Sequence, residues 1–309
     1  MRAQLQWRHT LAQPLACDVP DSTPGLPGCC AGRTPVYHRA VHALPRAILF
    51  DLDDTILSAY RDPDRAWRAV VEEHATSLVP YGSAEIVAAI MAHARSFWAD
   101  PERHRHWRMR LQEARREIVR GAFAKLASVA SSPLGDDAAV RLADRFTRLR
   151  EEELHVFPGA CETLDALRER GVTLALVTNG SSDLQRPKIA RFDLARRFDH
   201  VQIEGEHGFG KPEERAYQHA MQALSVTARE TWMVGDNLEW EVAAPQRLGI
   251  HAVWLDVDGT GLPAGSEVRP DRTIRALGEL LDVPRAPAVE RRYHAIAGGK
   301  SDGSCQEPE

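Results

Sequence analysis

Short apolar runs alternate with helical patterns along most of the chain. Five runs have the length and the continuous apolar character of strands that are buried on both faces of a parallel sheet. They cover residues 47–50, 172–177, 201–203, 231–234 and 251–255. Amphipathic helical segments lie between the later runs, for example at residues 161–170 and 215–224. This alternation predicts an α/β fold with a Rossmann-like, wound parallel sheet.

One interval departs from the alternation. Between residues 59 and 153 the pattern is helical throughout, rich in Arg, Glu, His and Ala, and contains no convincing strand. Such an interval is too long for a crossover connection, so it predicts an all-α domain inserted after the first strand. Residues 45–58 and 154–283 would then form the α/β core. The segments 1–44 and 284–309 lack a sustained period, and we expect them to be disordered.

Composition and charge narrow the classes of function. The chain has 309 residues, of which 43% are hydrophobic and 27% charged, enough for one large globular domain or two smaller ones. The net charge of −5 and the lack of a long basic run argue against a nucleic acid polymer or a membrane surface as partner. No apolar stretch approaches the roughly 20 residues that span a bilayer. We expect a cytoplasmic monomer or homodimer.

Two aspartates directly follow the first predicted strand. Ligands of an open parallel sheet bind outside the carboxyl ends of its strands, which places Asp51 at the ligand-binding edge. A carboxylate there can attack a phosphoryl group and form an acyl-phosphate. Asp53 can protonate the leaving oxygen and later deprotonate the attacking water, while Thr55 can tie the loop together through hydrogen bonds to the backbone. The alternative interpretation is an acidic turn that caps a following helix.

A second polar segment comes at the end of the second predicted strand. The hydroxyl of Thr178 and the backbone N–H groups of Asn179 and Gly180 can donate to phosphate oxygens. Asn-Gly is also a common turn dipeptide. A hairpin turn fits poorly, however, because Ser182 and Gln185 follow at capping-box spacing, which predicts the start of a helix.

Lys211, Asp236 and Glu241 complete a candidate site for phosphate and metal. Lys211 can neutralise Asp51 and the transferred phosphoryl group, or be an ordinary solvated loop lysine. Asp51, the backbone carbonyl of Asp53, and Asp236 would give Mg²⁺ three oxygen ligands. Glu241 would hold a metal-bound water, and Asp236 could equally cap the next helix. Three carboxylates this close repel one another, so we expect a divalent cation to be obligatory.

Together these motifs resemble the haloacid dehalogenase superfamily, in its helical-cap (C1) phosphatase branch. The matching segments are DLDDT at 51–55, TNG at 178–180, GKP at 210–212, and GDN at 235–237 with Glu241. Gln185, Lys188 and the segments 198–199, 233–239 and 252–254 look most like N-acylneuraminate-9-phosphatases and related nucleotidases.

The resemblance implies a role for each motif residue. It implies Asp51 as nucleophile, Asp53 as acid and base, and Thr178 and Lys211 as phosphate ligands. Asp51, Asp53 and Asp236 would bind Mg²⁺.

The resemblance also implies a reaction, the hydrolysis of small-molecule phosphomonoesters through an aspartyl-phosphate. Dehalogenases of the superfamily lack an acid at the position of Asp53, which favours phosphate esters here. Glu241 departs from the pattern, because the second acid of the last motif is usually Asp. A phosphomutase of the same branch and a non-catalytic sensor of phosphorylated ligands stay open as alternatives.

Cationic and aromatic side chains in the helical interval are candidates for substrate selection. The cluster lies within a few helical turns and could bind an anionic or sugar-like leaving group. It comprises His104, Arg105, His106, Trp107 and Arg108, with Arg95, Trp98 and Arg103 nearby. Alternatively, the two tryptophans belong to the core of the helical domain and the arginines are solvated. In the superfamily such a cap can open and close over the site. The physiological substrate is not predicted, because a fold by itself does not determine function.

Overall fold

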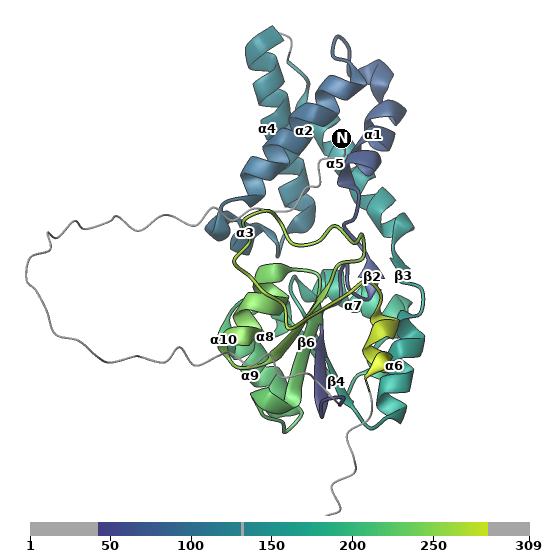
Figure 1. The fold of residues 1–309 in the computed structure, drawn as a ribbon. Helices are drawn as coiled ribbons and strands as arrows, with labels where there is room; N and C mark the ends of the chain where they lie inside the picture. The colour runs from purple at the N-terminus through teal and green to yellow at the C-terminus, as the bar shows by residue number, and fades with distance from the viewer. Residues whose placement is uncertain (1–42, 131–132, 284–309) are drawn as a thin grey trace, which may run out of the picture.

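The structure, a computed structural model, describes residues 43–130 and 133–283. Almost all of the two segments that we expected to be disordered therefore lies outside the described residues. Figure 1 shows a sheet flanked by helices, with a bundle of helices beyond the carboxyl ends of its strands.

The sheet has six parallel strands in the order β5-β4-β1-β6-β7-β8. The strands are β1 Ala47–Phe50, β4 Thr173–Thr178, β5 His200–Ile203, β6 Thr231–Gly235, β7 His251–Leu255 and β8 Arg272–Ile274. The predicted wound parallel sheet is thus confirmed. The sequence pattern did not predict β8, because this short edge strand buries only Ile274 and has no apolar run.

Helices cover both faces of the sheet. Ile48 and Phe50 of β1 belong to the hydrophobic core on one face, and Leu49 belongs to the core on the other, as the alternation of side chains along a strand requires. The longer helices are α6 Ala160–Glu169, α7 Ser182–Arg191 and α9 Glu214–Ala223. The short ones are η2 Ala195–Arg197, α8 Glu204–His207, η3 Ala228–Glu230, the π-helix η4 Leu238–Ala243, α10 Ala244–Arg247 and η5 Leu277–Asp282.

The helical bundle, called the cap below, has a hydrophobic core of its own. Its elements are α1 Pro63–Glu73, η1 Ala75–Ser77, α2 Ser83–Trp98, α3 Pro101–Trp107, α4 Leu111–Ala130 and α5 Asp136–Glu153. Trp67 stacks on Phe146 at 3.9 Å between ring centroids. The chain leaves and re-enters the α/β core through the antiparallel pair β2 Leu57–Ser58 and β3 His155–Val156. The domain boundaries given above stay a prediction.

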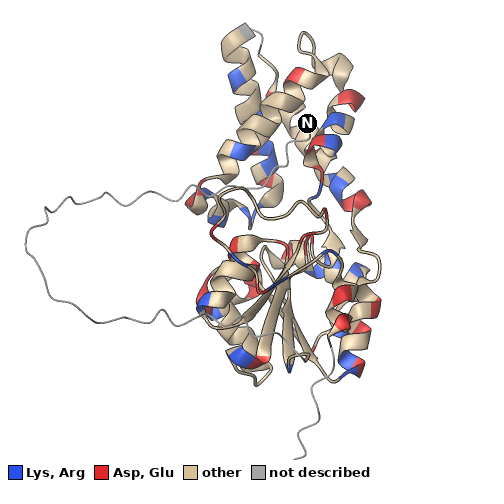
Figure 2. Cartoon of the chain, in the orientation of Figure 1, with Lys and Arg blue, Asp and Glu red and all other residues tan. Residues whose placement is uncertain are grey.

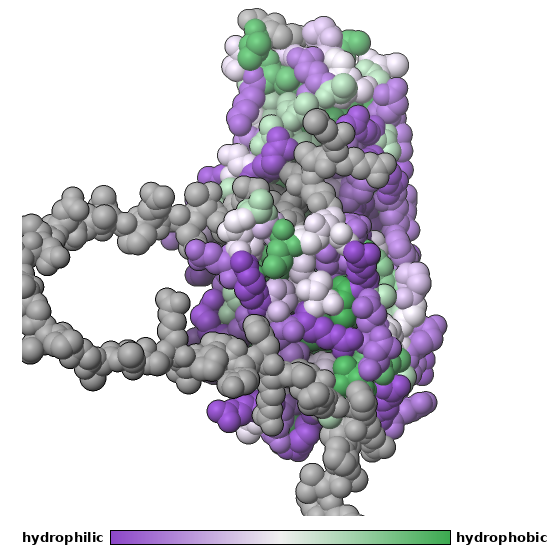
Figure 3. All heavy atoms as spheres, in the orientation of Figure 1, coloured by the Kyte–Doolittle hydropathy of each residue, from purple (hydrophilic) through white to green (hydrophobic). Residues whose placement is uncertain are grey.

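The surface is polar in most places. On the face shown in Figure 3, hydrophobic residues lie scattered among hydrophilic ones, and Figure 2 shows acidic segments in the loops between the sheet and the cap. None of the described helices is long and apolar enough to cross a membrane.

Candidate active site

Asp51 lies at the centre of the carboxyl edge of the sheet. It directly follows β1, between β4 and β6, and its N–H donates to the carbonyl of Val234 at 3.0 Å. The loop after it is held by Asp54, which has a φ of 61° and accepts hydrogen bonds from the N–H groups of Ala59 and Tyr60. The role that we expected for Thr55 is wrong, because its buried hydroxyl has no partner among the described residues. The left-handed backbone at Asp54 instead places its carboxylate within reach of the two N–H groups.

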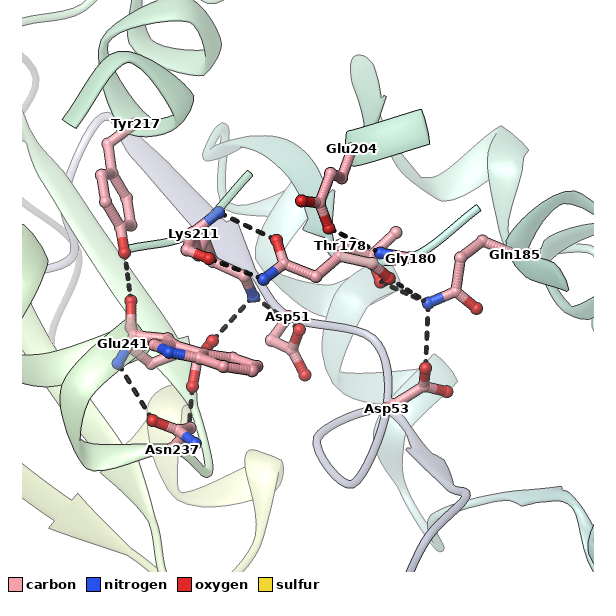
Figure 4. A network of polar contacts seen from close by, with 12 residues as sticks. Asp51, Asp53, Thr178, Gly180, Gln185, Glu204, Lys211, Tyr217, Asn237 and Glu241 are labelled. Atoms are coloured by element: carbon pink, nitrogen blue, oxygen red, sulfur yellow. Dashed lines mark hydrogen bonds and ion pairs between the residues drawn. The ribbon is translucent and has the colours of Figure 1, made fainter. Parts of the chain in front are cut away.

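Lys211 is fully buried between two carboxylates, as Figure 4 shows. Its Nζ lies 2.6 Å from Oδ1 of Asp51 and 2.7 Å from Oε1 of Glu241. Burial opposes the charge of the ammonium, but the two carboxylates outweigh it and raise the pKa of Lys211. Burial also raises the pKa of Asp51, against the effect of Lys211, and raises that of Glu241 to about 7. Lys211 is therefore an active-site cation and not a solvated loop lysine.

The position of Glu241 depends on a glycine and on a helix cap. A Cβ at Gly235 would lie 2.1 Å from Cγ of Glu241, so only glycine leaves room for this side chain. Oε2 of Glu241 accepts from the N–H of Asn237 at 2.8 Å. The side chain of Asn237 caps η4 by accepting from the N–H groups of Glu239 and Trp240. The helix cap that we considered for Asp236 is thus one residue later.

Asp236 is left with an uncompensated carboxylate. Its backbone carbonyl accepts from Nε1 of Trp254 at 2.8 Å, but its carboxylate makes no hydrogen bond or ion pair with any other described residue. Burial, followed by the charges of Glu241, Asp54 and Asp51, raises the pKa of Asp236 well above its ordinary value. This environment is suited to a cation.

The donor set of the predicted metal site is compatible with Mg²⁺. Carboxylate and carbonyl oxygens are the ligands that this ion prefers. In residues 43–130 and 133–283, no three His, Cys, Asp or Glu side chains are grouped so that they could hold a metal ion. The predicted site requires only two carboxylates, those of Asp51 and Asp236, together with the carbonyl of Asp53. This ligand set stays a prediction.

The carboxylate of Asp53 has cationic and amide partners of its own. Nζ of Lys188 lies 2.8 Å from both of its oxygens, and Nε2 of Gln185 lies 2.9 Å from Oδ2. Lys188 also donates to the hydroxyl of Tyr60 at 3.3 Å. Lys188 therefore offsets the negative charge of Asp53 at close range.

The predicted repulsion is nevertheless present, because burial and, to a smaller extent, the charge of Asp53 raise the pKa of Asp51. Burial and the charges of Glu241, Asp54 and Asp51 do the same to Asp236.

Gln185 also bonds to the segment that we expected to bind phosphate. Its Nε2 donates to Oγ1 of Thr178 at 2.8 Å and to the carbonyl of Asn179 at 2.7 Å. The predicted helix does begin at Ser182. It has no capping box, however, because Oγ of Ser182 donates to Glu206 and the side chain of Gln185 points into the site (Figure 4).

The N–H of Gly180 already has a partner, Oε2 of Glu204 at 3.0 Å. The predicted contact of Gly180 with phosphate therefore stays a prediction.

The cap reaches the core through two members of the predicted cluster, His104 and Arg108, and not through the others. Arg95, Arg105 and His106 are exposed, and Trp107 packs on Phe97 with ring centroids 5.8 Å apart. Trp107 is therefore part of the cap core, and the structure gives the other three no contact with the carboxyl edge of the sheet.

Two neighbours on the same segment make this contact instead. His104 packs against Trp240 at 5.2 Å, and Arg108 pairs with Glu204.

The sequence interpretation thus missed three residues as members of the site, Gln185, Lys188 and Glu204, and it did not foresee that Arg108 of the cap cluster pairs with Glu204. Gln185 and Lys188 are three residues apart on α7, a spacing that puts two side chains on one face of a helix. That spacing is a signal that could have been used. Arg108 and Glu204 lie 96 residues apart, and no local pattern relates them.

Comparisons with known proteins relate the sequence and the fold of the chain to a family of enzymes. A model of the haloacid dehalogenase-like hydrolase family matches residues 45–249. The phosphoserine phosphatase of Thermus thermophilus is 37% identical over 197 residues, which cover 63% of this chain and 69% of that protein. The ribulose-1,5-bisphosphate 5-phosphatase of Halopiger xanaduensis is 30% identical over 256 residues, which cover 77% of this chain and 98% of that protein.

A solved structure shares the fold. The HAD-hydrolase YfnB of Bacillus subtilis superposes with a TM-score of 0.56 at 24% identity, over 78% of this chain and 98% of that one. The sequence motifs, the match over residues 45–249 and the two phosphatase relatives lead to one conclusion. The chain belongs to the haloacid dehalogenase-like hydrolases, as its motifs predicted.

Proposed function

We propose that the chain is an Mg²⁺-dependent phosphomonoesterase that hydrolyses small phosphorylated metabolites through an aspartyl-phosphate on Asp51. The observation that carries the proposal is the different environment of two carboxylates two residues apart. Lys211 bonds Asp51, whereas Lys188 bonds both oxygens of Asp53. Two carboxylates in different surroundings can take separate parts in one reaction. The relatives, which act on phosphoserine and on ribulose 1,5-bisphosphate by their names, support this substrate class.

Asp51 would be the nucleophile of the first half-reaction. One of its oxygens forms a bond to phosphorus while the bond between phosphorus and the leaving oxygen breaks. Asp53 in its protonated form gives its proton to that oxygen, and the alcohol departs. The ammonium of Lys211 stays beside Asp51 and balances the negative charge of the phosphoryl group.

Water would attack the phosphorus in the second half-reaction. Asp53, now ionised, takes a proton from the water as the new bond forms. The bond between phosphorus and Asp51 breaks, which releases inorganic phosphate and restores the carboxylate. Thr178 can hold the phosphate throughout, because its hydroxyl accepts from Gln185 and makes only a 3.4 Å contact as donor, to the carbonyl of Asn179.

Mg²⁺ would be held by the carboxylates of Asp51 and Asp236 and the carbonyl of Asp53. When bound, it supplies positive charge that favours transfer of the phosphoryl group. The partnerless carboxylate of Asp236 supports this assignment. The prediction that Glu241 holds a metal-bound water has less support, because its two oxygens already bond Lys211 and the N–H of Asn237.

The test is phosphate release from p-nitrophenyl phosphate, phosphoserine, sugar phosphates and nucleoside monophosphates. We expect Mg²⁺-dependent release that stops with a chelator, returns with added Mg²⁺, and falls by at least about 1,000-fold in Asp51→Asn. Asp64→Asn, an equal change of charge on the cap, is the control. Release that survives both the chelator and Asp51→Asn would contradict the proposal. Turnover that requires a bisphosphate would indicate a mutase, and binding without turnover would indicate a sensor.

A further inference from the structure

One cap side chain, Arg108, contacts two segments of the core, the one between β5 and α9 and the one after β6. Its Nε donates to Oε1 of Glu204 at 3.1 Å, and Nη2 donates to the same oxygen. Its Nη1 donates to the backbone carbonyl of Lys211 at 3.3 Å. The guanidinium also lies over the ring of Trp240, 5.7 Å from the centroid. Arg108 therefore joins the cap to the segments that follow β5 and β6.

Glu204 connects Arg108 to the segment expected to bind phosphate. Its Oε2 accepts from the N–H of Gly180, as Figure 4 shows, while Oε1 faces Arg108. The same two loops are joined by Asn179, whose amide donates to the carbonyl of Lys211 at 2.7 Å and accepts from its N–H at 2.8 Å. Any movement of Glu204 must therefore change the hydrogen bonding of Gly180 or break the ion pair with the cap.

The ion pair is well shielded from water. The side chains of Arg108 and Glu204 are only 11% and 8% exposed. Removing one partner from such a pair leaves a buried charge without compensation, which costs far more than breaking an exposed pair. Arg105, on the same helix, is exposed and contacts none of these loops. It therefore provides a matched control within the cap.

We propose that Arg108 is a positioning residue that couples contact of the cap with the core to the conformation of the phosphate-binding segment, acting through Glu204. With the cap seated, Arg108 holds Glu204 against the N–H of Gly180 and holds the carbonyl of Lys211. With the cap withdrawn, Glu204 loses its cation and both loops lose a shared partner. This role rests on the proposed phosphomonoesterase function.

The test is a double-mutant cycle between Arg108→Met and Glu204→Gln, with Arg105→Met as control. We expect each single change at the pair to lower kcat/KM for p-nitrophenyl phosphate roughly 10- to 100-fold, whereas the control stays within about 2-fold. The kcat/KM of the double variant should be no lower than that of the less active single variant, because both changes break the same interaction. Losses that multiply in the double variant would overturn the proposal, as would equal effects of Arg108→Met and Arg105→Met.

Hydrogen exchange of the Gly180 amide gives a second, independent reading. A change confined to the cap would leave this amide as it is, whereas coupling through Glu204 predicts faster exchange in Arg108→Met and unchanged exchange in Arg105→Met. This measurement needs no turnover, so it decides the role of Arg108 even if the full-length chain releases no phosphate. If Arg108→Met does not fold, Glu204→Gln, which keeps an oxygen for the Gly180 amide, is expected to give the same kinetic defect. Wild-type kinetics from it would overturn the proposal.

Discussion

Replacing Lys211 by methionine tests how the buried charges of the site depend on one another. The methionine side chain has nearly the length of lysine but no charge, so the change removes the ammonium and little else. It leaves the carboxylates of Asp51 and Glu241, which lie 2.6 and 2.7 Å from Nζ, without a cation. In the absence of metal, these groups can avoid repulsion only by taking up a proton.

The expected loss of stability depends on pH. The pKa of Glu241 is about 7 in the folded protein, above its ordinary value of 4.5, so folding binds a proton and the unfolding free energy falls as pH rises from 4.5 to 7. Without Lys211 this pKa rises further. Near pH 6 the Glu241 carboxyl is protonated with or without the lysine, so this group changes the free energy of unfolding of the variant only a little. Above pH 7, each pH unit then lowers the free energy of unfolding of the variant by about 1.4 kcal/mol relative to the wild type. The loss reaches about 2 kcal/mol near pH 8.5.

The assay is thermal unfolding in a chelator at about pH 6 and about pH 8.5. For a chain of this size, about 2 kcal/mol corresponds to a fall in Tm of roughly 3–4 °C. We expect this additional fall for Lys211→Met at the higher pH alone. Lys125→Met, which removes an exposed ammonium from α4, should show no such difference. The same fall in Tm at both pH values would refute the idea that ionised carboxylates cause the loss.

Two further changes separate the roles of neighbouring residues. Asp53→Asn should lower kcat/KM for an alkyl phosphate by about 100-fold or more. The kcat/KM for p-nitrophenyl phosphate should fall by less than about 10-fold, because nitrophenolate leaves without a proton. Equal losses for the two substrates would argue against Asp53 as the acid. Gly235→Ala places a Cβ 2.1 Å from Cγ of Glu241 and should lower both Tm and phosphate release, whereas Gly82→Ala, with open space around it, should change neither. Wild-type activity in Gly235→Ala would contradict the need for Glu241 beside Lys211.

Three expectations about local hydrogen bonds at the site differ from the structure, although the predicted helix does begin at Ser182. Asp54 ties the first loop in place of Thr55, and Asn237 caps η4 in place of Asp236. Ser182 and Gln185 have capping-box spacing but bond elsewhere. Short polar side chains have several backbone groups within reach, and small differences in dihedral angles decide among them.

The predicted cap residues illustrate the same point at longer range. Arg95, Arg105, His106 and Arg108 have similar chemistry, and composition does not distinguish them. Which of them contacts the core depends on the rotation of α3 and on how the cap sits over the sheet. Arg108, just past the end of α3, is the residue that pairs with Glu204.

The sequence by itself determined the parallel sheet, the helical insertion and the place of Asp51, Asp53, Lys211 and Asp236 in one site. Apolar runs and their period are local properties, and in a wound sheet residues just past the carboxyl ends of neighbouring strands meet at one edge. Only the tertiary structure decided that Lys188 neutralises Asp53 and that Arg108 pairs with Glu204. Lys188 and Asp53 are 135 residues apart, and Arg108 and Glu204 are 96 apart. Such contacts follow from packing between distant elements, because hydrophobic burial sets the arrangement of those elements without regard to their separation along the chain.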